Sequence, residues 1–203
     1  QPKIRSAAAI ACLKHVATGK PLWRTERADE ISTWGTPTLL TGPGGDELVT
    51  NGTKVRAYDP ATGKVRWTLG PNSEITVGTP VAGKDVVYVT GGYPPVRPVY
   101  AVKAGASGDI SLPKGETRSE AIAWSNDREG TYIPTPLLYR DILYTLNSNG
   151  ILTAYDANTG AMVQDDGTIV VLDFGMVVRV PLELRRERRD RALDPHLVVA
   201  LAG

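Results

Sequence analysis

Short runs of alternating hydrophobic and polar residues follow one another along most of the chain. The runs Asp85–Thr90 and Ile151–Asp156 show the two-residue period of a strand with one buried face. The chain also contains 21 glycines and 15 prolines among its 203 residues, which is typical of a protein with many tight turns. The pattern therefore predicts an all-β fold of short strands.

The strands belong to a sequence repeat. The segment Val55–Trp67 (VRAYDPATGKVRW) recurs as Leu152–Val163 (LTAYDANTGAMV) and, in degraded form, as Cys12–Trp23 (CLKHVATGKPLW). All three copies share a Thr-Gly turn, and in two of them a tryptophan follows the glycine by four residues. A repeat of this kind indicates that the fold is built from similar structural units.

A second marker has a similar period. Thr-Pro pairs begin at Thr36, Thr79 and Thr135, and the longer of the two intervals contains an insertion at Gly105–Ala121. The middle unit still keeps a tryptophan, Trp124. Each unit contains four expected strands within about 43 residues, which is typical of β-propeller blades. We therefore expect a partial propeller of about three four-stranded blades.

Turn residues occupy fixed places in the units. Asn51-Gly52 and Asn149-Gly150 lie between the second and third strands, where the pattern predicts two-residue hairpins with positive φ at both positions. Asp59 and Asp156 begin the Asp-x-x-Thr-Gly sequences. Their carboxylates should accept hydrogen bonds from the following backbone N–H groups, and the glycine should be left-handed.

The sequence Ala57–Trp67, echoed in Ala154–Gly160, resembles the pyrroloquinoline quinone (PQQ)-like β-propeller repeat. This repeat occurs in quinoprotein alcohol dehydrogenases and in the lipoprotein propeller of the outer-membrane barrel assembly machinery. The resemblance covers about residues 12–163 and implies a periplasmic or exported protein, although no signal peptide is visible. It also implies structural roles, including packing between blades, for eight repeat positions: Trp23, Tyr58, Asp59, Gly63, Trp67, Tyr155, Asp156 and Gly160.

The repeat stops after Val163, and residues 165–190 resemble a different family, the UbiB/AarF atypical kinase-like proteins. In that family a hairpin carries Asp-Phe-Gly and is followed by a proline and an Arg-rich helix. The resemblance implies that Asp173 is a Mg²⁺ ligand. The lysine, phosphate loop and catalytic aspartate of a kinase have no counterpart upstream. We therefore expect a propeller over 1–164 and a foreign segment, a hairpin plus a helix, over 165–203. Alternatively, these apolar strands complete the third blade.

Charge and composition narrow the expected chemistry. Lys and Arg number 23 and Asp and Glu 22, so no net charge favours nucleic acid. Cys12 is the only cysteine, which excludes an intrachain disulfide. His15 and His196 lack metal-ligand spacing, and no apolar run is long enough to span a membrane as a helix.

The loops Thr90–Pro98 and Ser125–Thr131 depart most from the repeat. Loops on a rigid scaffold often carry function, and the candidate ligand-binding residues there are Tyr93, Arg97, Asp127 and Arg128. The alternative is that both are irregular surface turns.

The sequence thus predicts a non-catalytic binding or scaffold module for a protein or small-molecule ligand, with no cofactor. One alternative is a fragment of a PQQ-dependent dehydrogenase. Such an enzyme would need PQQ with calcium, seven or eight blades and commonly a cysteine pair. The other is a remnant of a kinase-like protein. Three blades leave open strand edges, so we also expect the chain to self-associate.

Overall fold

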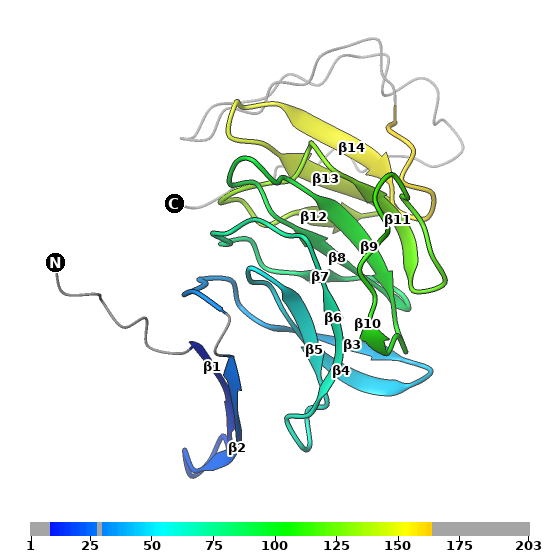
Figure 1. The fold of residues 1–203 in the computed structure, drawn as a ribbon. Coiled ribbons are helices and arrows are strands. Elements are labelled where there is room, and N and C mark those ends of the chain that lie inside the picture. Colours follow the sequence, from blue (N-terminus) through cyan, green and yellow to red (C-terminus); the bar gives the residue numbers. More distant parts are fainter. Residues whose placement is uncertain (1–8, 28–29, 164–203) are drawn as a thin grey trace, which may run out of the picture.

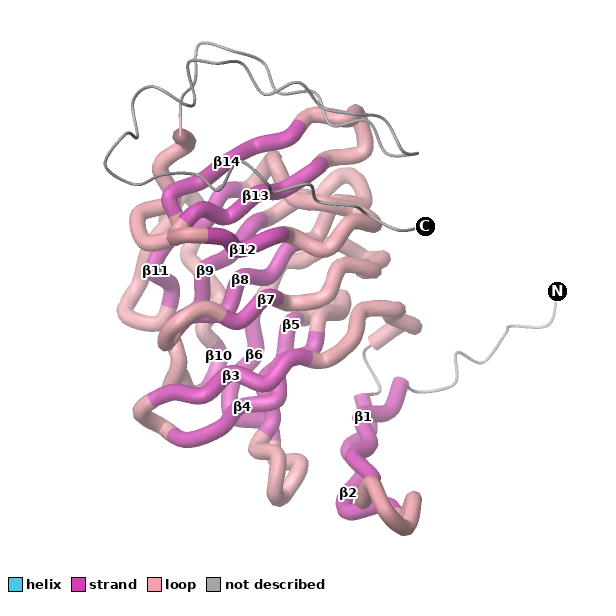
Figure 2. The backbone as a smooth tube through the Cα atoms, turned by 180° about the vertical axis from the view of Figure 1, so that it is seen from behind, coloured by secondary structure: helices cyan, strands magenta, loops and turns pink. Residues whose placement is uncertain are grey.

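The computed structural model describes residues 9–27 and 30–163 of the chain, and all regular structure in these residues is β (Figures 1 and 2). The fourteen strands form four sheets that follow one another along the sequence. The predicted all-β, propeller-like fold is confirmed. In the described residues no helix is long and apolar enough to cross a membrane.

The first blade is an antiparallel sheet whose strands pair in chain order. Its strands are β3 (Thr38–Gly42), β4 (Gly45–Thr50), β5 (Val55–Tyr58) and β6 (Val65–Leu69). The short strand β10 (Gly108–Asp109) adds to the outer edge of β6 in parallel. Because β10 comes from the insertion between the second and third Thr-Pro pairs, this insertion protects an edge strand of the first blade.

The second blade also has four antiparallel strands, and the third has three in the described residues. The second contains β7 (Val81–Ala82), β8 (Val86–Thr90), β9 (Val99–Lys103) and β11 (Ile122–Asn126). The third contains β12 (Leu137–Tyr139), β13 (Ile142–Leu146) and β14 (Leu152–Asp156). A single bridge between Tyr155 and Met162 continues the third blade beyond β14, so its fourth strand is not part of the described structure.

The degraded repeat copy forms a separate hairpin of β1 (Ala9–Lys14) and β2 (Pro21–Arg27), which lies beside the first blade (Figure 1). In the repeat, these two strands correspond to β5 and β6. The hairpin is therefore the second half of a further blade rather than part of the first.

Two large hydrophobic cores lie between the blades, and a smaller cluster of Trp23 and Tyr58 lies between the hairpin β1–β2 and the first blade. The first joins Leu40, Val49 and Trp67 of the first blade to Val87 and Val102 of the second. The second joins the second blade to the third, with Tyr88 and Trp124 packed against Leu143 and Tyr155. Face-to-face packing of successive sheets explains why each strand has one apolar side directed at a neighbouring blade.

The Thr-Pro pairs align as a hydrogen-bonded ladder. The backbone N–H of Thr36 donates to Thr79 Oγ1 at 3.2 Å, and the N–H of Thr79 donates to Thr135 Oγ1 at 3.2 Å. These hydrogen bonds join the segments that precede the first strands of successive blades. The Thr-Pro pair therefore recurs once per blade because it makes the same contact between neighbouring blades.

The prediction for the two Asn-Gly turns was wrong. Neither Asn51 nor Gly52 has a positive φ. In the second sequence Gly150 has φ 78°, but Asn149 does not have a positive φ. The Asn51 side chain is buried in long-range hydrogen bonds instead. The two-residue turn with positive φ at both positions is Arg140-Asp141, with φ 47° and 62°, between β12 and β13.

Candidate functional site

Four loops of the first two blades lie at the same ends of their strands. Thr50 pairs with Arg56 and Val55 with Leu69, so the loops 51–54 and 70–80 start from the same ends of the antiparallel strands. The loops 91–98 and 127–136 occupy the same places in the second blade. We call these four loops the loop face.

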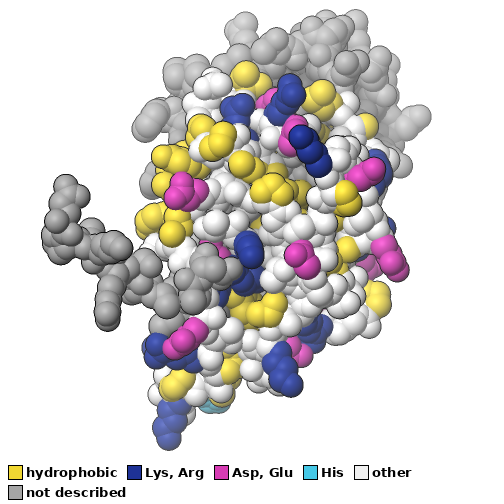
Figure 3. Space-filling view, in the orientation of Figure 1, with side chains coloured by type: hydrophobic (Ala, Val, Ile, Leu, Met, Phe, Trp, Pro, Cys, Tyr) yellow, Lys and Arg dark blue, Asp and Glu magenta, His cyan; other side chains and the backbone are white. Residues whose placement is uncertain are grey.

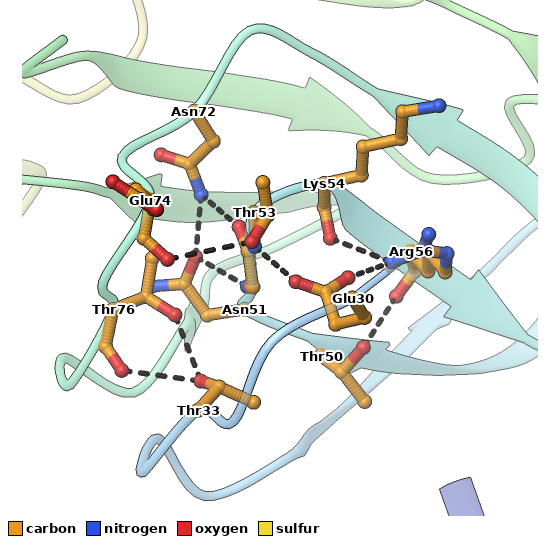
Figure 4. Close-up of polar contacts among 11 residues, drawn as sticks. Glu30, Thr33, Thr50, Asn51, Thr53, Lys54, Arg56, Asn72, Glu74 and Thr76 are labelled. Atoms are coloured by element: carbon orange, nitrogen blue, oxygen red, sulfur yellow. Dashed lines mark hydrogen bonds and ion pairs between the residues drawn. The ribbon is translucent and has the colours of Figure 1, made fainter. Parts of the chain in front are cut away.

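Buried side-chain amides hold the loop face together (Figure 4). Asn51 Nδ2 donates to the carbonyls of Gly78 and Thr90 at 2.9 and 2.8 Å. Asn72 Nδ2 donates to Asn51 Oδ1 and to the Gly52 carbonyl at 2.8 and 2.7 Å. Because backbone groups of the loops 51–54 and 70–80 and of β8 meet at two amides, these two loops are connected to each other and to the second blade rather than independent.

A buried ion pair adds a second connection. The Glu30 carboxylate is completely buried, accepts a hydrogen bond from the Thr53 N–H and pairs with the Arg56 guanidinium. Arg56 also donates to the Lys54 carbonyl at 3.3 Å. This pair could not be predicted from the sequence because its members are 26 residues apart, and the local signal is a single arginine in the short strand Val55–Tyr58.

The structure brings the two loops predicted to bind ligand together through their backbones. The Gly130 N–H donates to the Arg97 carbonyl at 3.0 Å, and the rings of Tyr93 and Tyr132 lie 5.4 Å apart. Asp127 and Arg128 are exposed and 3.6 Å apart, so their ion pair contributes little to stability. The four candidate residues therefore share one surface, with Tyr93 and Arg97 half-buried and Asp127 and Arg128 exposed.

Exposed apolar side chains lie on the connections that lead into the Thr-Pro ladder. Trp34 and Ile133 are 63% and 61% exposed, and each precedes its ladder threonine by two residues. On the side of the molecule drawn in Figure 3, acidic and basic side chains are interspersed with apolar ones. Exposed aromatic and aliphatic side chains beside arginine are common where proteins bind one another.

Two repeat tryptophans make the same contact in different blades. Trp23 Nε1 donates to the Pro60 carbonyl at 2.7 Å, and Trp124 Nε1 donates to the Ala157 carbonyl at 2.8 Å. Their rings pack on Tyr58 and Tyr155, respectively. Each tryptophan thus docks on the Asp-x-x-Thr-Gly hairpin of the next blade.

Trp67 lies in the first hydrophobic core and has a different partner. Its Nε1 donates to Glu47 Oε2 at 2.8 Å, and Glu47 Oε1 accepts the Gly105 N–H at 2.7 Å. The tryptophan and the buried glutamate therefore connect the first blade to the second through a satisfied polar contact.

The aspartates and glycines of the two Asp-x-x-Thr-Gly hairpins have the expected conformations. Asp59 Oδ1 and Asp156 Oδ1 each accept backbone hydrogen bonds from the residues two and three positions later. Gly63 and Gly160 have φ 71° and 73°. The hydrogen bond from Arg66 and the turn N–H groups lower the pKa of Asp59 to about 2.

Burial also raises the pKa of several tyrosines. The pKa values of Tyr88 and Tyr100 rise to about 12, and that of Tyr155 is raised further in the same direction. All three therefore remain neutral hydroxyls at physiological pH. Within the described ranges, no group of three His, Cys, Asp or Glu side chains could hold a metal ion.

Comparison with known protein families agrees with the repeat assignment. Residues 7–167 match the family model described as outer membrane protein assembly factor BamB. BamB from Moraxella catarrhalis is similar, with 19% identity, a TM-score of 0.46, and 81% of this chain and 47% of that chain covered. The computationally designed Ika4 protein matches at 17% identity and a TM-score of 0.43, over 70% of this chain and 81% of its own. No curated protein matches the sequence.

The chain thus spans about half the length of the Moraxella BamB chain. No comparison supports the resemblance of residues 165–190 to the UbiB/AarF family. Asp173 lies outside the described residues, and its role as a Mg²⁺ ligand stays a prediction. The family model covers the whole repeat region, residues 12–163, and more than half of the sequence. On this match, the chain belongs to the BamB family of PQQ-like β-propeller proteins.

Proposed function

We propose that the chain is a non-catalytic binding module that takes a protein segment on the loop face. The observation that supports this proposal most strongly is the series of hydrogen bonds that joins the four loops. Asn51 and Asn72 join the loops 51–54 and 70–80 to the end of β8. Ser73 Oγ in the loop 70–80 donates to the Val96 carbonyl, and the Gly130 N–H donates to the Arg97 carbonyl. A preorganised surface loses less entropy on binding than mobile loops would. Tyr93, Arg97, Asp127 and Arg128 are the proposed contacts on that surface.

A protein ligand suits this surface better than a small molecule. Small-molecule sites are concave and largely apolar, whereas Asp127 and Arg128 are charged and exposed. The exposed Trp34 and Ile133 add apolar area of the kind that protein partners cover. The family description names an outer membrane protein assembly factor. We therefore place the chain in the periplasm beside the outer membrane, with an assembly protein as its partner.

Binding measurements with loop variants test this function. The immobilised 203-residue chain would be titrated with purified outer-membrane assembly proteins of the organism that encodes it. Tyr93→Ala and Arg128→Ala should each weaken binding about tenfold, or about 1.4 kcal/mol. Lys84→Ala, at an exposed turn between β7 and β8, is the control and should bind normally. Equal affinity of all variants would place the binding surface elsewhere.

A further inference from the structure

The chain contains two Asn-Gly sequences in corresponding hairpins of different blades. Asn51-Gly52 lies between β4 and β5, and Asn149-Gly150 lies between β13 and β14. In such a sequence the backbone nitrogen of the glycine can attack the side chain of the preceding asparagine, because glycine has no Cβ atom to hinder the approach. The same local chemistry is available at both places, and the fold decides where it occurs.

The fold protects Asn51 from this reaction. Its side chain is buried, and Nδ2, the leaving nitrogen, donates to the Gly78 and Thr90 carbonyls at 2.9 and 2.8 Å. Its Oδ1 accepts hydrogen bonds from the Gly52 N–H at 3.1 Å and from Asn72 Nδ2 at 2.8 Å. The carboxamide therefore cannot rotate or meet water unless these buried hydrogen bonds break together.

Asn149 lies in the opposite environment. It is exposed, and its side chain makes no hydrogen bond with any residue that the structure describes. The turn around it is closed by Asn147 instead, whose Oδ1 accepts the N–H groups of Asn149 and Ile151 at 2.9 and 3.1 Å. The Asn147 carbonyl accepts the Gly150 N–H at 3.0 Å. Water can replace these hydrogen bonds when the turn opens locally, so the Asn149 carboxamide is free to reach the Gly150 nitrogen.

We propose that Asn149 is a site of spontaneous deamidation, at which the chain is converted to an isoaspartyl form. The Gly150 nitrogen attacks Cγ of Asn149, the Cγ–Nδ2 bond breaks, and the Gly150 proton leaves with Nδ2 as ammonia. The product is a five-membered succinimide ring, which water then opens. Attack of water at Cγ gives aspartate, and attack at the main-chain carbonyl gives isoaspartate, whose backbone runs through Cγ and is longer by one methylene group.

Either product changes the hairpin between β13 and β14. A carboxylate replaces a neutral amide at the strand ends that correspond to those of the loop face. The isoaspartyl form also lengthens the turn that Asn147 closes by hydrogen bonds. The site shares no residue with the proposed ligand contacts, so it does not depend on the proposed function.

Incubation of the intact chain at mildly alkaline pH tests this site. Peptide mass mapping with electron-transfer fragmentation locates both the mass gain and the isoaspartyl linkage. Asn149 should gain about 1 Da, at a rate about tenfold or more above that of Asn51, because Asn51 reacts only after its buried hydrogen bonds break. In concentrated urea, where the fold is lost, the two sites should react at similar rates.

Asn149→Gln is the test variant, because glutamine would have to form a larger ring and reacts far more slowly. It should remove the mass gain and the isoaspartyl linkage from the hairpin between β13 and β14. Asn158→Gln is the matched control, because Asn158 is also exposed in the third blade but precedes Thr159 instead of a glycine. It should leave the yield at Asn149 unchanged. Equal rates at Asn149 and Asn51 in the folded chain, or an isoaspartate yield unaltered by Asn149→Gln, would overturn the proposal.

Discussion

Gly63 excludes a larger residue for two separate reasons. Its φ of 71° is unfavourable for a β-branched residue, and a Cβ atom there would lie 2.5 Å from the Trp23 ring. Gly19 occupies the same turn position with φ 65° but has open space around it. The comparison of these two glycines separates backbone strain from the tryptophan contact.

We therefore expect Gly63→Val to lower the free energy of unfolding by about 1–3 kcal/mol from strain alone, with a further loss from the displaced ring. Gly19→Val should show only the strain. Thermal unfolding followed by tryptophan fluorescence measures both variants. Equal losses at the two positions would contradict the docking of Trp23 on this hairpin, and a loss below about 0.5 kcal/mol in Gly63→Val would contradict the turn itself.

Asp59 gives the chain a dependence on acidic pH. Its folded pKa of about 2 lies below the ordinary value of 3.8, mainly because of the hydrogen bond from Arg66. The carboxylate thus stabilises the fold above pH 3.8, and this contribution is lost as the pH falls towards 2. Urea unfolding at a series of pH values should show a smaller loss over this window in Asp59→Asn. If the unfolding free energy of Asp59→Asn fell with pH as steeply as that of the unmodified chain, the Asp59–Arg66 contact would not be formed in solution.

Residues with local partners could be predicted from the sequence, and residues with distant partners could not. The turn hydrogen bonds of Asp59 and the positive φ of Gly63 are set within one turn, so these conformations follow from the Asp-x-x-Thr-Gly pattern. The hydrogen bonds of Asn51 join it to carbonyls 27 and 39 residues away. The local reading of Asn51-Gly52 as a tight hairpin was wrong because these distant carbonyls determine its conformation.

The connections between strands depend on such distant contacts. Asn51→Ala would leave the Gly78 and Thr90 carbonyls without the amide that donates to them, and Asn72 would keep only its hydrogen bond to the Gly52 carbonyl. We expect it to cost about 1–3 kcal/mol in unfolding free energy. Asn149→Ala, in the other Asn-Gly sequence, should cost less than about 0.5 kcal/mol because Asn149 is exposed. Chemical denaturation of both variants tests this difference, and similar costs would contradict the role of Asn51.

The strands could be predicted from their two-residue period. Which strands belong to the same blade could be predicted only in part. Repeat markers identified the blades, and the structure shows that the Cys12–Trp23 copy forms its own hairpin. The strand β10 has only two residues and pairs with Trp67 and Thr68 about 41 residues earlier. No periodic pattern could reveal so short a pairing, which depends on the tertiary position of the insertion.

At the scale of the whole molecule, the strands that the structure describes leave part of one face of the first blade exposed. Leu39 pairs with Leu48 at the position where Leu138 pairs with Leu143 in the third blade. Leu138 and Leu143 belong to the core between blades, whereas Leu39 is 51% exposed. The difference arises because the hairpin β1–β2 provides only two strands beside the first blade.

We expect this surface to cause self-association of the isolated chain. Sedimentation velocity at increasing concentration should show oligomers, and Leu39→Glu should shift the distribution towards monomer. Val16→Glu, in the exposed turn between β1 and β2, is the control for added charge. A monodisperse monomer at all concentrations would show that the uncovered face does not drive association.

The claim that the loop face binds a protein partner is tested most directly by hydrogen exchange of the intact chain, alone and saturated with a purified outer-membrane assembly protein. We predict slower exchange in residues 91–98 and 127–136 on binding, because these loops carry the four proposed contacts. Exchange in the turn between β7 and β8, at the opposite ends of the strands, should stay the same. Saturable binding that slows exchange only in the third blade or in the hairpin β1–β2 would contradict binding at the loop face.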